Sequence, residues 1–218
     1  MNELTLIQKI SVWAIPVLLA ITVHEVAHGW AASKLGDQTA KMLGRLTLNP
    51  LKHIDPIGTV IVPLALLLLG GFIFGWAKAV PVTAKNFKNP RRDMAWVAMA
   101  GPASNLIMAV GWALIAKLGV ILQASSPDIG LFLLYSGLAG ISINLILLVL
   151  NLLPIPPLDG SHVLSALLPP ALAWQYNRIA PFGFVILLVL LISGFLTPIL
   201  IGPYSYLQHG LYALVGIQ

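Results

Sequence analysis

The chain has 218 residues, of which 58% are hydrophobic and 9% charged, whereas soluble globular domains carry about 25% charged residues. This composition excludes an ordinary soluble domain and predicts a membrane protein. The formal net charge is +5, but the basic residues cluster in two segments between apolar stretches, as in cytoplasmic loops, so we expect no nucleic-acid partner. Because the chain has no cysteine, any metal must be bound by His, Asp, Glu or Asn side chains.

Four apolar stretches reach the length of about 20 residues that a helix needs to cross a bilayer. They are residues 10–32, 94–117, 131–153 and 179–201. We therefore expect a single integral membrane domain over residues 1–218, α-helical and polytopic, with about four to five transmembrane helices. The C-terminal residues 204–218 are apolar but short, and we expect an interfacial or partly inserted helix there.

A fifth apolar stretch, residues 58–76, contains a proline and a Gly-Gly pair, which weaken a straight helix. The segments on both sides of it, residues 33–57 and 77–93, are basic. The positive-inside rule places both segments in the cytoplasm, so the stretch is predicted to enter and leave by the same face as a re-entrant segment, with a full crossing as the alternative. The first span then runs from outside to inside.

The first span contains the sequence His24-Glu25-Val26-Ala27-His28. Residues four apart lie on one face of a helix, so both imidazoles can bind one zinc ion, while Glu25 can take a proton from a water molecule as general base. Hydrogen bonding between helices is the structural alternative. Such contacts usually use Ser, Thr, Asn or Gln, and ionisable residues at hydrocarbon depth are costly unless paired or metal-bound. The motif therefore predicts a metal site.

A catalytic zinc ion needs a third protein ligand, and Asp159 is the best candidate. It ends an apolar span in the run Asn151-Leu-Leu-Pro-Ile-Pro-Pro-Leu-Asp159-Gly160, and that span also ends on the predicted cytoplasmic side. The prolines leave irregular backbone, which is tolerated near a membrane only where protein or a water-filled cavity surrounds it. His162 is the rival ligand, and a helix end with an exposed carboxylate is the structural alternative.

The two motifs together resemble the site-2 protease family of membrane-embedded zinc proteases, in its compact bacterial and archaeal branch without a PDZ domain. The resemblance covers roughly residues 10–168, and further matches are residues 49–58, 74–82, 90–93 and 101–105. It implies an active site between the HEVAH helix and the LDG helix. It also implies that part of the stretch after Gly58 folds as a re-entrant β element.

The resemblance assigns roles to the motif residues. It implies one zinc ion per chain, bound by His24, His28 and Asp159, with Glu25 as the base. It further implies that Asn151 contacts an unwound substrate strand together with the proline run, which includes Pro154 and Pro156.

Four other polar residues carry weaker expectations. Asn105 is a candidate for hydrogen bonding to substrate near the active site, with packing between helices as an equal alternative. Asn144 is expected to hold helices together, and His53 to stabilise a turn or support the site rather than bind metal. His209 is expected to lie at the membrane interface.

We therefore expect an intramembrane zinc metalloendopeptidase that spans the cell membrane several times, with its active site towards the cytoplasm. Its expected partners are transmembrane protein substrates and the lipid bilayer, and the oligomeric state is left open. A divalent-metal transporter is one alternative, because broken helices with His, Asp and Asn also form ion pathways. A non-catalytic membrane assembly factor is the other. Glu25 discriminates between transport and hydrolysis, since hydrolysis needs it beside a metal that it does not bind.

Overall fold

The computed structural model of the protein describes residues 4–62 and 75–217, and within these ranges it contains helices and no strands. Among the described residues, four helical stretches are long and apolar enough to cross a membrane: Leu6–Leu35, Pro90–Leu122, Pro127–Asn151 and Pro170–Ile192. The prediction of an α-helical polytopic membrane protein is therefore confirmed.

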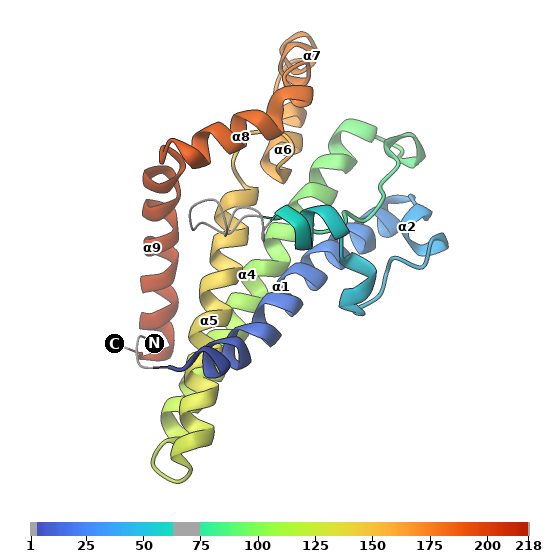
Figure 1. The fold of residues 1–218 in the computed structure, drawn as a ribbon. Helices are drawn as coiled ribbons and strands as arrows, with labels where there is room; N and C mark the ends of the chain where they lie inside the picture. Colours follow the sequence, from blue (N-terminus) through green and yellow to red (C-terminus); the bar gives the residue numbers. More distant parts are fainter. Residues whose placement is uncertain (1–3, 63–74, 218) are drawn as a thin grey trace.

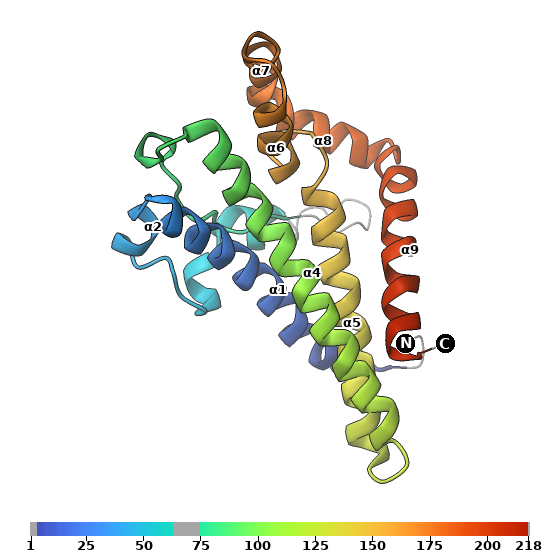
Figure 2. The same ribbon diagram turned by 180° about the vertical axis from the view of Figure 1, so that it is seen from behind.

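Three long helices lie side by side and form the bundle that carries the site (Figures 1 and 2). They are α1 (Leu6–Leu35), α4 (Pro90–Leu122) and α5 (Pro127–Asn151). Both α4 and α5 begin with proline, which suits the first turn because its missing N–H would have no partner there. The two helices pack closely because small residues line their contact; Ala109 and Ala113 are fully buried against Ile141 and Leu145.

The C-terminal part consists of shorter helices that surround one end of the bundle and return along it. These are α6 (Asp159–Leu167), α7 (Pro170–Asn177), α8 (Gly183–Ile192) and α9 (Leu196–Val215). Leu211 and Val215 of α9 pack into the α4–α5 core. In Figure 1, α8 runs below α7 in the upper part of the view, and α9 descends beside α5.

Two sequence expectations about this part differ from the structure. The expected span 179–201 is divided between α8 and α9, because the chain turns at Gly194, whose φ is +77°. Residues 204–215 of the expected short interfacial helix belong to α9, which has 20 residues and packs against the bundle.

Short helices connect these elements at the end of the bundle where α1 finishes and α4 begins. They are α2 (Thr39–Met42), the 3-10 helices η1 (Pro50–His53) and η3 (Ala84–Asn86), and the π-helix η2 (Pro56–Ile61); a further 3-10 turn, η4 (Ala180–Phe182), precedes α8. The two basic segments contact each other here: Arg45 donates to the Lys78 carbonyl at 2.8 Å, and the Lys78 N–H donates to the His53 carbonyl at 2.9 Å. The loop of residues 123–126 lies at the opposite end (Figures 1 and 2).

Most of the stretch 58–76 lies outside the described residues, and the predictions of a re-entrant segment and of a β element there stay predictions. Its two ends are in contact. The Trp76 N–H donates to the Gly58 carbonyl at 3.0 Å, and the Thr59 hydroxyl donates to the Trp76 carbonyl at 2.9 Å.

Candidate metal centre

The HEVAH motif lies in the C-terminal half of α1, on the face that packs against α4. Gly101 of α4 permits this close approach, because a Cβ atom there would lie 2.6 Å from Cε1 of His24 and would also overlap His28. The two imidazoles therefore lie directly on the backbone of α4. Any residue larger than glycine at this position would overlap the imidazoles.

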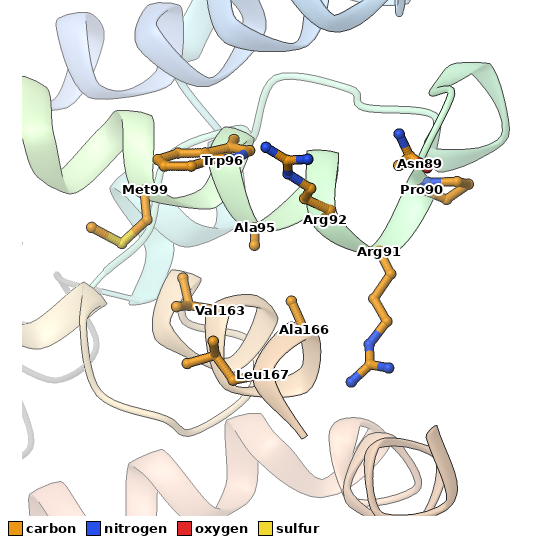
Figure 3. A pocket seen from close by; sticks show the side chains of 10 residues that line it. All are labelled: Asn89, Pro90, Arg91, Arg92, Ala95, Trp96, Met99, Val163, Ala166 and Leu167. Carbon is orange, nitrogen blue, oxygen red and sulfur yellow. The ribbon is translucent and has the colours of Figure 1, made fainter. Parts of the chain in front are cut away.

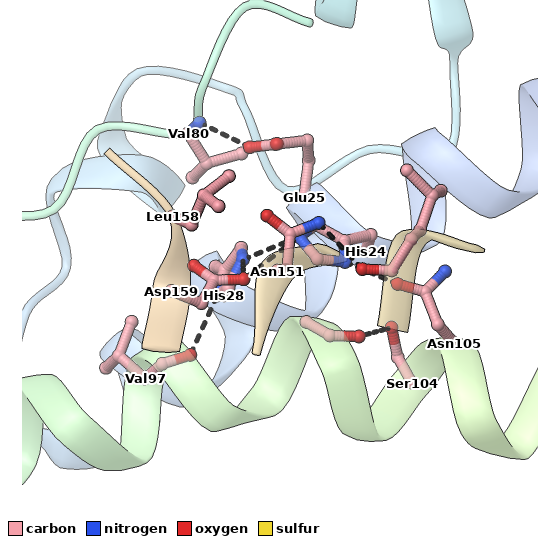
Figure 4. A network of polar contacts seen from close by, with 12 residues as sticks. His24, Glu25, His28, Val80, Val97, Ser104, Asn105, Asn151, Leu158 and Asp159 are labelled. Atoms are coloured by element: carbon pink, nitrogen blue, oxygen red, sulfur yellow. Dashed lines mark hydrogen bonds and ion pairs between the residues drawn. The ribbon is translucent and has the colours of Figure 1, made fainter. Parts of the chain in front are cut away.

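Three side chains converge at this point from two helices (Figure 4). The Nε2 atoms of His24 and His28 are 3.0 Å apart, and they lie 3.3 and 3.4 Å from Oδ2 of Asp159. Asp159 is the first residue of α6, which packs against α4. Gly160 lets α6 start so close to the end of α5, because a Cβ atom there would overlap the Leu152 and Leu153 carbonyls.

The other ring nitrogen of each histidine is already used. Nδ1 of His28 lies 2.7 Å from the Val97 carbonyl, and Nδ1 of His24 lies 2.6 Å from Oδ1 of Asn105. Because a backbone carbonyl only accepts, His28 must carry its proton on Nδ1, which leaves the Nε2 lone pair directed at the cluster. Metal-bound histidines usually donate their second nitrogen in this way.

The donor set fits a zinc ion. Zinc ligands lie about 2.0–2.2 Å from the metal, so two corners of a tetrahedron are about 3.3–3.6 Å apart, close to the separations of the three donor atoms. Oδ2 of Asp159 is buried and accepts no hydrogen bond from the residues that the structure describes. Two imidazoles and a carboxylate are also a known ligand set of catalytic zinc.

Glu25 stands next to this group without belonging to it. Its Oε2 atom accepts a hydrogen bond of 2.9 Å from the Val80 N–H, and its carboxylate is not one of the three converging donors. Val80 lies in the non-helical segment of residues 75–83, which leads into η3. This contact could not be predicted from the sequence, because no residue pattern in a non-helical segment specifies which side chain its amide meets.

Asn151 ends α5 beside the cluster, as Figure 4 shows, and its Nδ2 donates to the Leu147 carbonyl at 2.9 Å. Pro154 and Pro156 follow in the turn that leads from α5 to Asp159. Pro154 is exposed and its carbonyl accepts from the Tyr176 hydroxyl at 2.9 Å, whereas Pro156 is buried. The structure thus brings Asn151 to the metal cluster and places the prolines in the adjoining turn.

Asn105 lies on the opposite side of His24 from the metal cluster. It is fully buried on α4. Besides accepting from His24, its side chain donates to Oδ1 of Asn144 at 2.9 Å and to the Ala20 carbonyl at 3.3 Å. The polar atoms of Asn105 are therefore used within the bundle.

The remaining histidines lie apart from the three donor atoms. His53 is buried and its Nε2 donates to the Thr47 carbonyl at 2.9 Å. His162 lines a cavity of about 450 Å³ together with Arg91 and Trp174. His209 is exposed on α9, with Nδ1 2.6 Å from the Ser205 carbonyl.

A separate groove of about 610 Å³ lies between the start of α4 and α6 (Figure 3). It is lined by Asn89, Pro90, Arg91, Arg92, Ala95, Trp96, Met99, Val163, Ala166 and Leu167. None of the three metal-cluster residues is among them, so this groove is distinct from the metal centre.

An apolar helical bundle in which an HExxH pair meets an aspartate from a later helix defines a class, the membrane-spanning zinc metalloproteases. Comparison with known proteins agrees. The profile of Peptidase family M50 matches residues 115–193. The chain is 41% identical over 184 residues to "Putative zinc metalloprotease YwhC" of Bacillus subtilis. The aligned region covers 82% of this chain and 79% of that protein.

Two mycobacterial relatives are more distant. Both are named "Putative zinc metalloprotease Rip2". The one from Mycolicibacterium smegmatis is 34% identical over 81% of this chain and 64% of its own length, and the one from Mycobacterium tuberculosis (strain H37Rv) is 32% identical over 92% and 73%. No solved structure matches significantly. The chain belongs to peptidase family M50, the site-2 protease family, and is a zinc metalloprotease with membrane-spanning helices.

Proposed function

We propose that the protein hydrolyses peptide bonds of transmembrane substrate helices, with one zinc ion bound by His24, His28 and Asp159 and with Glu25 as general base. The observation that carries this proposal is the convergence of the three donor atoms beside a glutamate that is not one of them. His24, Glu25 and His28 lie on a helix apolar enough to span a membrane, where ionisable side chains are retained for function.

The chemistry follows from the positions of these groups. A zinc ion held by the three residues supplies a Lewis acid that polarises a carbonyl group and acidifies water. The Val80 N–H holds Glu25 through Oε2, which leaves Oε1 to take a proton from the attacking water and to return it to the leaving amine. The hydrogen bonds on Nδ1 of His24 and His28 keep both rings oriented throughout.

Hydrolysis inside a membrane also requires an unwound substrate, because the peptide bonds of a helix are shielded by their own hydrogen bonds. Asn151 lies beside the cluster and can bond the exposed substrate backbone. The segment around Val80 is non-helical, so a substrate strand could pair alongside it by β-augmentation. Asn151 and the Pro154–Pro156 turn are our candidates for substrate contact.

We further propose that the protein crosses the cell membrane several times with its active site towards the cytoplasm. The two basic segments contact each other at the end of the bundle nearer the HEVAH motif. The loop at the far end, residues 123–126, has no basic residue. Excess Lys and Arg in short loops favours the cytoplasmic side.

A comparison of membrane proteomes tests the function. Cells that carry the intact chain are compared with cells that carry Glu25→Gln at equal protein level. The proposal expects single-span membrane proteins that accumulate uncut only with Glu25→Gln, and cleavage positions within their transmembrane helices. Accumulated substrates cut only in soluble domains, or identical proteomes, would contradict intramembrane proteolysis.

A further inference from the structure

On the side of His24 that faces away from the metal cluster, a series of buried hydrogen bonds connects α1, α4 and α5. It starts at Nδ1 of His24 on α1, passes through Asn105 on α4 and ends at Asn144 on α5. His24 is 7% exposed and the two asparagines are 0% exposed. Figure 4 shows the contact between His24 and Asn105. Buried amides are costly unless their hydrogen bonds are made.

Two backbone carbonyls determine which way each amide points. Nδ2 of Asn144 donates to the Gly140 carbonyl at 2.8 Å, and since a carbonyl accepts only, the Oδ1 atom of Asn144 must face Asn105. Nδ2 of Asn105 then donates both to that oxygen and to the Ala20 carbonyl. The Oδ1 atom of Asn105 is left to face His24. Neither amide can flip without placing a donor against a donor or an acceptor against an acceptor.

The fixed order of donors and acceptors determines the tautomer of the His24 imidazole. Because Oδ1 of Asn105 accepts, Nδ1 of His24 must carry the proton, and the Nε2 lone pair then points at His28 and Asp159. His28 obtains the same tautomer from the Val97 carbonyl, which is backbone. Of the two histidines, only His24 has a tautomer that is set by side chains, and this tautomer therefore depends on the residue types at positions 105 and 144.

We propose that Asn105 and Asn144 are positioning residues that hold His24 in its metal-binding tautomer and ring orientation, with Asn144 acting through Asn105. The inference rests on the proposed metal site and deepens it. It differs from a purely structural role, because the bond from Asn105 Oδ1 is made to the imidazole and not to a helix backbone. It also differs from substrate binding, since both amides are fully buried.

The test measures zinc affinity of the purified full chain by competition with a chelator, without reference to proteolysis. Asn105→Ala should weaken zinc binding by about 10- to 100-fold, as loss of a histidine's outer partner does. Asn144→Ala should cause a smaller loss, about three- to tenfold, because Asn105 keeps its bond to the Ala20 carbonyl. Asn105→Asp should stay near the wild-type affinity, because a carboxylate also accepts from Nδ1–H.

The same Asn105→Asp variant separates positioning from packing. It loses both donor bonds to Asn144 and Ala20, so the apoprotein should have a lower Tm even though zinc affinity is kept. Ser136→Ala on α5 is the matched control, since Ser136 is buried two turns before Asn144 and its hydroxyl has no partner among the described residues; its zinc affinity should not change. Unchanged zinc affinity in Asn105→Ala, or an equal loss in Asn105→Asp, overturns the inference. A wild-type chain that binds no zinc overturns the metal site itself, and this inference with it.

Discussion

Asp159 and His162 lie three residues apart on α6, and their surroundings distinguish them as ligands. Oδ2 of Asp159 lies 3.3 and 3.4 Å from the two imidazole nitrogens, whereas His162 faces a cavity near Arg91 and Trp174. We therefore expect Asp159→Ala to lose most of its bound zinc and His162→Ala to retain it. Metal analysis of the two purified variants decides between them. Zinc lost from His162→Ala but kept in Asp159→Ala would mean a site of three histidines.

The convergence of the three candidate metal ligands could be predicted in part from local sequence patterns. The i, i+4 spacing of His24 and His28 puts two imidazoles on one face of any helix, and Asp159 follows a proline run at the end of a span. The partners of these residues could not be predicted. The contacts of Glu25 with Val80, and of Asn105 with Asn144, join segments 55 and 39 residues apart, and only the packing of the helices determines them.

Among the helices, the approach of α4 to α1 depends on Gly101. A methyl group there would overlap both imidazoles, and overpacking of this kind costs about 1–3 kcal/mol. Because that methyl group displaces the imidazoles themselves, Gly101→Ala should also weaken zinc binding, by about tenfold where about 1.4 kcal/mol of the cost falls on the metal-bound geometry. Gly111→Ala on the same helix is the control, because a methyl group there meets nothing within 4 Å. Equal zinc affinity in the two variants would rule out this role for Gly101.

Asp37 ties the end of α1 to the segment that carries Val80. Its buried carboxylate accepts from the N–H and hydroxyl of Thr39, from the Thr83 N–H at 2.7 Å and from Nδ2 of Asn86 at 2.7 Å. Burial alone would raise the pKa of the Asp37 carboxyl, but these hydrogen bonds lower it below its ordinary value. A lowered pKa means that the folded state favours the ionised form.

This linkage has a definite sign. The stabilisation by Asp37 is present above the unfolded pKa of about 3.9 and is lost as the pH falls through the lower folded pKa. Asp37→Ala should therefore lower the Tm at pH 7, by the loss of about 1–3 kcal/mol of buried hydrogen bonding, and the difference from wild type should shrink below about pH 4. Asp128→Ala, at an exposed position, is the control. A Tm difference for Asp37→Ala that persists unchanged in acid would argue against the carboxylate as its cause.

The long helices could be predicted from apolar length alone, and residues 10–32 and 94–117 lie inside α1 and α4. The C-terminal helices could not. The apolar run 179–201 is long enough to span, yet it turns at Gly194, and α9 packs on α5 through Leu211 and Val215. A hydropathy pattern reports only the length and polarity of a stretch. It therefore misses a turn that is stabilised by contacts with neighbouring helices.

For the molecule as a whole, the two basic segments contact each other towards one end of the bundle, and residues 123–126 lie at the other end. Because the chain has no cysteine, single cysteines can report on sidedness without background. Cysteines at the exposed positions Lys41 and Lys88 should resist an impermeant thiol reagent added outside intact cells, and one at Ser125 should react. Opposite accessibility of Lys41 and Lys88 would show that residues 58–76 cross the membrane completely.

The central claim is that Glu25 takes and returns the proton while His24, His28 and Asp159 hold the metal. The most direct measurement combines zinc content and cleavage for Glu25→Gln, purified and reconstituted with a substrate that accumulates uncut in Glu25→Gln cells; His209→Ala serves as the control. We expect about one zinc ion per chain in Glu25→Gln and a loss of cleavage of about 10³-fold or more, because the base and the metal act as one unit. Loss of zinc from Glu25→Gln, or cleavage at the wild-type rate, would contradict it.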